Sequence, residues 1–106
     1  MADSPLAPAP LPVPSEPDAR VMLLDRDGCH LCDAARPVVL EEARRAGATV
    51  ERVDVDADPA VRAAWGDQVP VVAVDGRVVA RYRVDATSLR RALRPGPRWR
   101  RLLPGG

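Results

Sequence analysis

The distribution of proline restricts the fold of this chain more than any other feature. Of its 12 prolines, six lie within the first 17 residues. Proline fixes φ and has no backbone N–H, so this stretch cannot form a regular helix or a central strand. We predict that residues 1–19 form a disordered, polyproline-like tail and that residues 95–106, rich in Pro, Gly and Arg, form a flexible second tail. Residues 20–94 remain, enough for one small α/β domain.

Charge and hydropathy limit the partners and the compartment. The formal net charge is +1, so nothing general favours nucleic acid or a membrane surface as a partner. The start of the chain lacks the basic and apolar stretches of a secretory signal, and no run approaches the ~20 apolar residues of a membrane span. The basic cluster at residues 98–101 is either a solvated tail or a docking segment. We expect a cytoplasmic protein, monomeric, with no nucleic-acid and no membrane partner.

Residues 20–94 alternate between strand and helix patterns. The expected elements, in chain order, are a strand at 21–24, a helix at 31–46, a strand at 48–55, a helix at 59–65, strands at 69–74 and 78–82, and a helix between Asp85 and Pro95. The apolar runs around Asp75-Gly76 predict a hairpin with a type I′ turn. The first strand-helix-strand unit predicts a parallel, right-handed crossover. The sequence therefore predicts an α/β fold with the order βαβ-α-ββ-α.

Both cysteines lie where the first strand gives way to the first helix, in the stretch 25–32. The first turn of a helix offers unpaired N–H groups and the positive end of the backbone dipole, and both favour a thiolate. Cys29 occupies that position and is the candidate nucleophile, whereas Cys32 lies one turn further in. In a reducing cytosol a lone Cys-x-x-Cys is catalytic or metal-binding more often than structural.

Less specific interpretations of this stretch stay open. Cys29 and Cys32 provide two ligands where a structural zinc needs four, so a metal would require bridging between two chains. His30 is either a solvated loop residue or an imidazole that, when charged, stabilises the neighbouring thiolate. Asp25 and Asp27 either oppose that effect by their negative charge or serve as polar partners of the turn. From the sequence we expect no metal site.

The Cys-x-x-Cys at a helix start, the Val69-Pro70 pair before the hairpin and the element order resemble the thioredoxin fold over residues 20–94. Within that fold, the short chain and the Cys-His-Leu-Cys motif resemble small bacterial glutaredoxin-like proteins. The resemblance implies a four-stranded mixed sheet with flanking helices, Cys29 as the nucleophile and Cys32 as the resolving thiol. It also implies that Pro70 is cis, beside the dithiol, where the backbone of Val69 would pair with an extended substrate.

The resemblance extends to a basic residue three positions before the nucleophile, here Arg26, which would receive a substrate carboxylate or help to hold the thiolate. With His30, it completes the set of expected substrate-binding residues. Two features depart from glutaredoxins: Gln68 replaces the usual Thr before Val-Pro, and residues 80–85 replace the Gly-Gly turn that holds glutathione. We therefore expect no bound cofactor, and either glutathione or another low-molecular-weight thiol as the reductant.

These observations predict a thiol-disulfide oxidoreductase that acts on protein or small-molecule disulfides through Cys29 and Cys32. Its expected partners are a disulfide-containing protein or small-thiol substrate and a reductase. The alternative from another class is a redox-sensing or adaptor module that keeps the fold and the dithiol but regulates a partner without turnover.

Overall fold

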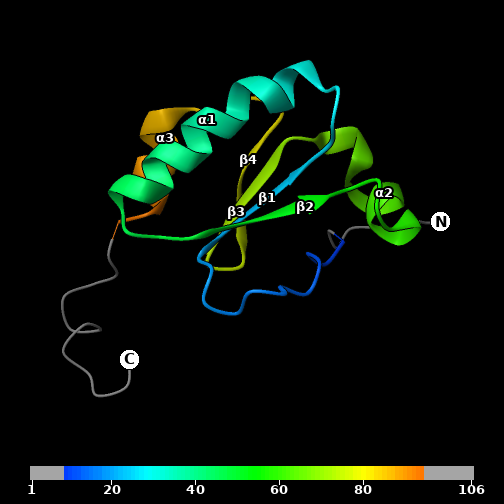
Figure 1. The fold of residues 1–106 in the computed structure, drawn as a ribbon, viewed down its shortest axis with the longest axis horizontal. Coiled ribbons are helices and arrows are strands. Elements are labelled where there is room, and N and C mark those ends of the chain that lie inside the picture. Colours follow the sequence, from blue (N-terminus) through cyan, green and yellow to red (C-terminus); the bar gives the residue numbers. More distant parts are fainter. Residues whose placement is uncertain (1–8, 95–106) are drawn as a thin grey trace.

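A computed structural model describes residues 9–94 of the chain (Figure 1). Its elements are β1 (Val21–Asp25), α1 (His30–Arg45), β2 (Val50–Asp54), α2 (Pro59–Trp65), the short 3₁₀ helix η1 (Gly66–Gln68), β3 (Val71–Val74), β4 (Arg77–Arg81) and α3 (Ala86–Ala92). None of the helices in this described range is long and apolar enough to cross a membrane. The predicted tail at 95–106 lies outside the described residues.

The strands form one four-stranded sheet in the order β2-β1-β3-β4. β1 pairs in parallel with β2, and β3 is antiparallel to both β1 and β4. The predicted element order and the mixed sheet are confirmed. In the parallel β1-α1-β2 unit, α1 starts just beyond the carboxyl end of β1, so both cysteines lie at that end of the sheet.

Local signals account for most element boundaries. The carboxylate of Asp58 accepts from the backbone N–H of Ala60 at 2.8 Å, and that of Asp85 accepts from Ser88 at 2.8 Å. These N-caps satisfy backbone donors that the helices leave unpaired. Asp75 and Gly76 have φ of 52° and 82°, which is the left-handed backbone that a type I′ hairpin turn requires.

The two faces of the sheet bury different clusters because successive strand residues point to opposite sides. We call the side of the sheet that packs against α1 and α3 the α1 face, and the other side the opposite face. On the α1 face the buried residues are Val21, Leu23, Val39, Ala43, Val72, Val74, Leu89 and Leu93. On the opposite face they are Met22, Leu24, Val55, Trp65, Val69, Val71 and Ala73, and this cluster continues to Cys32.

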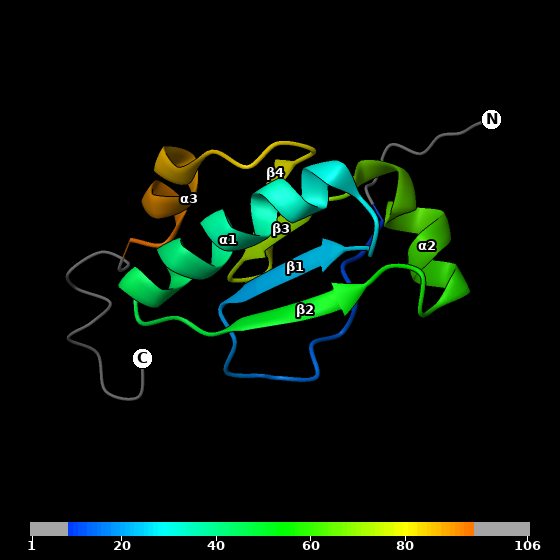
Figure 2. The same cartoon turned by 45° about the horizontal axis from the view of Figure 1, so that its top comes forward.

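The prediction of a tail at 1–19 differs from the structure for residues 9–19, while residues 1–8 lie outside the described part. Residues 9–19 run along the opposite face of the sheet, away from α1 (Figure 2). The indole N–H of Trp65 donates to the carbonyl of Pro10 at 3.2 Å. Proline cannot donate to a sheet, but its carbonyl still accepts and its ring still packs. The proline density therefore excluded a strand here without excluding docking.

Candidate dithiol site

A sharp turn places Cys29 at the start of α1. β1 ends at the fully buried Asp25, and Gly28 adopts a φ of 74°, a backbone conformation that side chains with a Cβ rarely take. Cys29 then follows with φ −99° and ψ 117° as the N-cap of α1. The turn thus presents the side chain of Cys29 to the unpaired N–H groups of the first helical turn.

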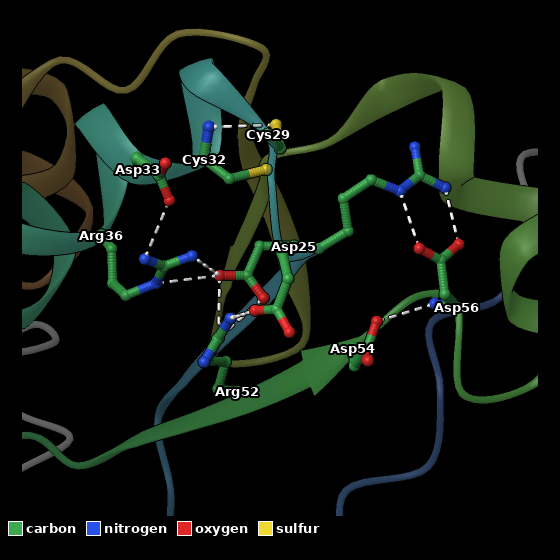
Figure 3. A network of polar contacts seen from close by, with 10 residues as sticks. Asp25, Cys29, Cys32, Asp33, Arg36, Arg52, Asp54 and Asp56 are labelled. Atoms are coloured by element: carbon green, nitrogen blue, oxygen red, sulfur yellow. Dashed lines mark hydrogen bonds and ion pairs between the residues drawn. The ribbon is translucent and has the colours of Figure 1, made fainter.

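The two sulfur atoms lie side by side at the N-terminal end of α1 (Figure 3). The Cys29 sulfur accepts from the backbone N–H of Cys32 at 3.1 Å. Both thiols are free; Cys29 is half-buried, and Cys32 is 0% exposed. Only Cys29 can be reached from solvent, so the structure gives the two cysteines different access to a reactant.

The environment of Cys32 favours the protonated thiol. Burial, followed by its hydrogen bond with Cys29, raises the pKa of Cys32 to about 11. A backbone hydrogen bond from Arg26 acts in the other direction, and the charges of Cys29 and Asp25 add smaller increases to the pKa. Near neutral pH, Cys32 is therefore protonated, and its backbone N–H contacts the Cys29 sulfur.

Arg26 is fixed by an acidic partner rather than left open. Its guanidinium donates to both carboxylate oxygens of Asp56, at 3.0 and 2.8 Å, and to the carbonyl of Gly66 at 3.0 Å. The hydrogen bonds with Asp56 raise the pKa of Arg26, and the nearby Cys29 and Cys32 sulfurs raise it further. Asp56 and Gly66 thus accept one hydrogen bond from each guanidinium nitrogen of Arg26. The positive charge of Arg26 still interacts with the two cysteine sulfurs.

Asp25 forms a buried ionic centre directly behind the dithiol, with one arginine on each side (Figure 3). Arg36 of α1 donates to it at 3.1 and 2.8 Å, and Nε of Arg52 of β2 donates at 2.8 Å to both oxygens. Asp27, by contrast, is exposed and accepts from a terminal nitrogen of Arg52 at 3.2 Å. Both aspartates thus have arginine partners, as the polar-partner interpretation predicts, and the negative charge of Asp25 also disfavours ionisation of Cys32.

Sequence reasoning missed Arg36 and Arg52. The register places Arg52 of β2 opposite Leu23 of β1, two residues before Asp25 and on the same face of the sheet. The available signal was a charged residue at the end of a fully apolar strand, because a carboxylate at such a site needs a cationic partner.

The remaining predicted site residues are Val69, Pro70 and His30. The Val69-Pro70 peptide bond is cis. Val69 is buried in the cluster that includes Cys32 and contacts Cys29, and Pro70 is fully buried. His30 is exposed as the first residue of α1. Across residues 9–94 no three His, Cys, Asp or Glu side chains converge as metal ligands would.

Solved structures share this architecture. The X-ray structure of protein XcR50 from X. campestris is 38% identical, with a TM-score of 0.58, and the alignment covers 69% of this chain and 93% of that one. A mutant thioredoxin from Halobacterium salinarum is 28% identical, with a TM-score of 0.53 and coverage of 88% and 93%. A protein from Nitrosomonas europaea, 21% identical with a TM-score of 0.56 and coverage of 74% and 94%, shares the fold. The fold is thus thioredoxin-like.

Sequence relatives define the family more narrowly. Uncharacterized proteins of Mycobacterium bovis and Mycobacterium tuberculosis are 36% identical over 76 residues, which cover 67% of this chain and 78% of each relative. The family described as Glutaredoxin-like domain (DUF836) matches residues 20–94, the range predicted for the folded domain. The Cys-x-x-Cys motif of Cys29 and Cys32 lies inside that match. This chain belongs to the glutaredoxin-like domain (DUF836) family.

Proposed function

We propose that this protein is a thiol-disulfide oxidoreductase that uses Cys29 as the attacking thiolate and Cys32 as the resolving thiol. One observation carries the proposal: the half-buried Cys29 sulfur caps α1 and accepts from the Cys32 N–H at 3.1 Å, while Cys32 itself is fully buried. A solvent-accessible sulfur held by a backbone donor is suited to attack a disulfide, and a buried thiol one turn away is suited to a second, intramolecular attack.

The reaction proceeds in two exchanges. The Cys29 thiolate attacks one sulfur of a substrate disulfide, forms a mixed disulfide and releases the first substrate thiolate, which takes up a proton. Cys32 then loses its proton and attacks the Cys29 sulfur, which breaks the mixed disulfide and releases the second substrate thiol. The substrate gains two electrons and two protons, and the protein is left with a Cys29–Cys32 disulfide.

The causes of the high pKa of Cys32 support this order of events. Two of them are its hydrogen bond with Cys29 and the charge of Cys29. Once Cys29 is joined to substrate, its thiolate charge is gone, and that part of the increase in the pKa of Cys32 disappears. We therefore expect the pKa of Cys32 to fall when the mixed disulfide forms.

Neighbouring side chains would bind the substrate in this mechanism. Arg26 is held by Asp56 within electrostatic range of both sulfurs, so it favours a negative charge on Cys29 rather than pairing with a substrate carboxylate. His30 is exposed beside Cys29, and Val69 lies in the same apolar cluster. We propose that His30 and Val69 contact the incoming disulfide. A low-molecular-weight thiol such as glutathione, or a reductase, would return the protein to the dithiol.

Trapping separates the roles of the two cysteines. Incubated with a protein or small-molecule disulfide, Cys32→Ser should accumulate a mixed disulfide on Cys29, located by mass spectrometry of its peptides. Cys29→Ser should form no adduct, because Cys32 is buried and protonated. Turnover with glutathione, with another small thiol and with a thioredoxin-reductase system should be compared in the unchanged protein. A single oxidation without turnover in all three would contradict the oxidoreductase and favour the redox-sensing module.

A further inference from the structure

The opposite face of the sheet is covered in an unusual way. α2 packs at one end of it, and the remainder is covered by a stretch without helix or strand (Figures 1 and 2). Residues 9–14, called the proline segment from here on, read Ala-Pro-Leu-Pro-Val-Pro. Ala9 and Leu11 of this segment pack against the buried cluster of that face.

Polar contacts hold the chain at both ends of the face. At the end near α2, the indole N–H of Trp65 donates to the carbonyl of Pro10 at 3.2 Å, and Trp65 is 3% exposed. At the other end, Glu51 of β2 accepts from the backbone N–H groups of Ser15 and Glu16, each at 3.0 Å. The groove thus supplies an indole donor, an apolar floor and a carboxylate acceptor in a row.

These groups suit a proline-rich chain in particular. Every second residue of the proline segment lacks a backbone donor, so its free polar groups are mainly carbonyls, which an indole N–H can satisfy. Proline also restricts the free chain, so ordering it on a surface costs less conformational entropy. An aromatic side chain that presents a donor next to an apolar groove is the usual means of binding such segments.

The proline segment does not fill its groove. A cavity of about 300 Å³ lies between it and the sheet, lined in part by Leu11, Met22 and Ala73. Cavities of about 360 and 280 Å³ flank it, one towards Val78 of β4 and one towards Val61 of α2. These three hollows are open to solvent, so the proline segment covers this face without filling it, as a bound peptide would.

We propose that the opposite face is a binding groove for proline-rich polypeptide, which the proline segment occupies as a tethered ligand. A free peptide of the same chemistry takes its place when the proline segment is displaced. The occupant has alternating prolines, an apolar side chain at the position of Leu11 and a carbonyl within reach of Trp65. The proposal does not depend on the redox chemistry, because its test measures binding alone.

The test displaces the proline segment in the full chain by Leu11→Asp and adds a fluorescein-labelled peptide of residues 9–16. Fluorescence polarisation should show saturable binding to Leu11→Asp and at least tenfold weaker binding to the unchanged chain. The difference arises because a tethered competitor acts at an effective concentration in the millimolar range. Val13→Asp is the matched control: it adds the same charge to the same segment at a side chain that is 89% exposed, and it should behave like the unchanged chain.

Two further measurements locate the binding site and test whether alternating prolines are required. Trp65→Phe, combined with Leu11→Asp, should weaken peptide binding about three- to tenfold, since it keeps an aromatic ring but removes the donor to Pro10. A peptide with the same composition but without alternating prolines should not bind. Equal binding of the two peptides, or no gain in Leu11→Asp, overturns the proposal. Loss of cooperative unfolding in Leu11→Asp also overturns it, because the proline segment would then belong to the core.

Discussion

The two faces of the sheet are built in different ways. On the α1 face, strand and helix side chains close the core by themselves: Val21 and Leu23 of β1 meet Val39 of α1 and Leu89 of α3. On the opposite face, the same strand contributes Met22 and Leu24 to a cluster that reaches the dithiol and is completed by an irregular segment. The comparison indicates that helices and strands close the core on the α1 face, while on the opposite face an irregular segment completes it.

The largest effect on stability should come from the α1 face. Leu89→Ala deletes a fully buried side chain between α3 and the sheet, and should lower the free energy of unfolding by about 2–5 kcal/mol, a large share of the stability of so small a domain. Urea unfolding monitored by circular dichroism measures the change. Leu40→Ala is the control on α1, because Leu40 is 50% exposed and its loss should cost little. If both variants lose the same free energy of unfolding, the α1 face is not the main source of stability.

Asp25→Asn tests the ionic centre between the α1 face and the dithiol. It removes a fully buried charge but leaves the donors of Arg36 and Arg52, which are partly exposed and can hydrate, so we expect a loss of about 1–3 kcal/mol. Asp33→Asn, which changes an exposed partner of Arg36, should have almost no effect. Urea unfolding again gives the measurement.

The same substitution should change the chemistry of Cys32. The negative charge of Asp25 is one cause of the raised pKa of Cys32, so Asp25→Asn should lower that pKa by a small amount. The pH dependence of the ¹³C chemical shift of the Cys32 Cβ, compared in Cys29→Ser with and without Asp25→Asn, measures the shift. A pKa that rises or stays constant would show that Asp25 does not act on the resolving thiol.

A matched leucine on the opposite face should matter less. Leu11→Ala truncates a half-buried side chain of the proline segment, and we expect a loss of about 0.5–1.5 kcal/mol, below that of Leu89→Ala. The two variants remove the same atoms, so their difference reports how tightly each face is packed. If Leu11→Ala lowers the free energy of unfolding as much as Leu89→Ala does, the two faces are packed equally tightly, and the contrast drawn between them is wrong.

The smallest effect should appear in acid. The pKa of Glu42 is lowered by Arg90, and that of Glu51 by the backbone N–H groups of Glu16 and Ser15. A lowered carboxyl pKa contributes stability that is present above the unfolded value of about 4.5 and is lost as the pH falls through the folded value. Glu42→Gln and Glu51→Gln should each flatten the dependence of the urea midpoint on pH below about 4.5. Hydrogen exchange of residues 9–16 should increase only in Glu51→Gln.

The sequence predicts the parts of the molecule whose signals are local. The caps at Asp58 and Asp85 and the turn at Asp75-Gly76 depend on residues a few positions apart, and the structure confirms them. The position of Cys29 at the start of a helix is a local signal of the same kind.

The features that escaped prediction join distant residues. Arg52 meets Asp25 only because β1 and β2 pair in one particular register. Trp65 and Pro10 are separated by 55 positions in the sequence. The density of prolines predicts which backbone hydrogen bonds cannot form, but it does not predict which surface the segment packs against. Partners set by tertiary register and by docking are therefore the part that the sequence of one chain does not disclose.

The strand order has a consequence for the solubility of the folded domain. β2 and β4 are the edges of the sheet, and an exposed edge can template the addition of a strand from another molecule. Each edge strand carries several charged residues: Glu51, Arg52 and Asp54 on β2, and Arg77 and Arg81 on β4. A strand added at either edge would have to bring matching charges or bury unpaired ones. We therefore expect these charges to disfavour edge-to-edge aggregation, even though the two central strands are almost wholly apolar.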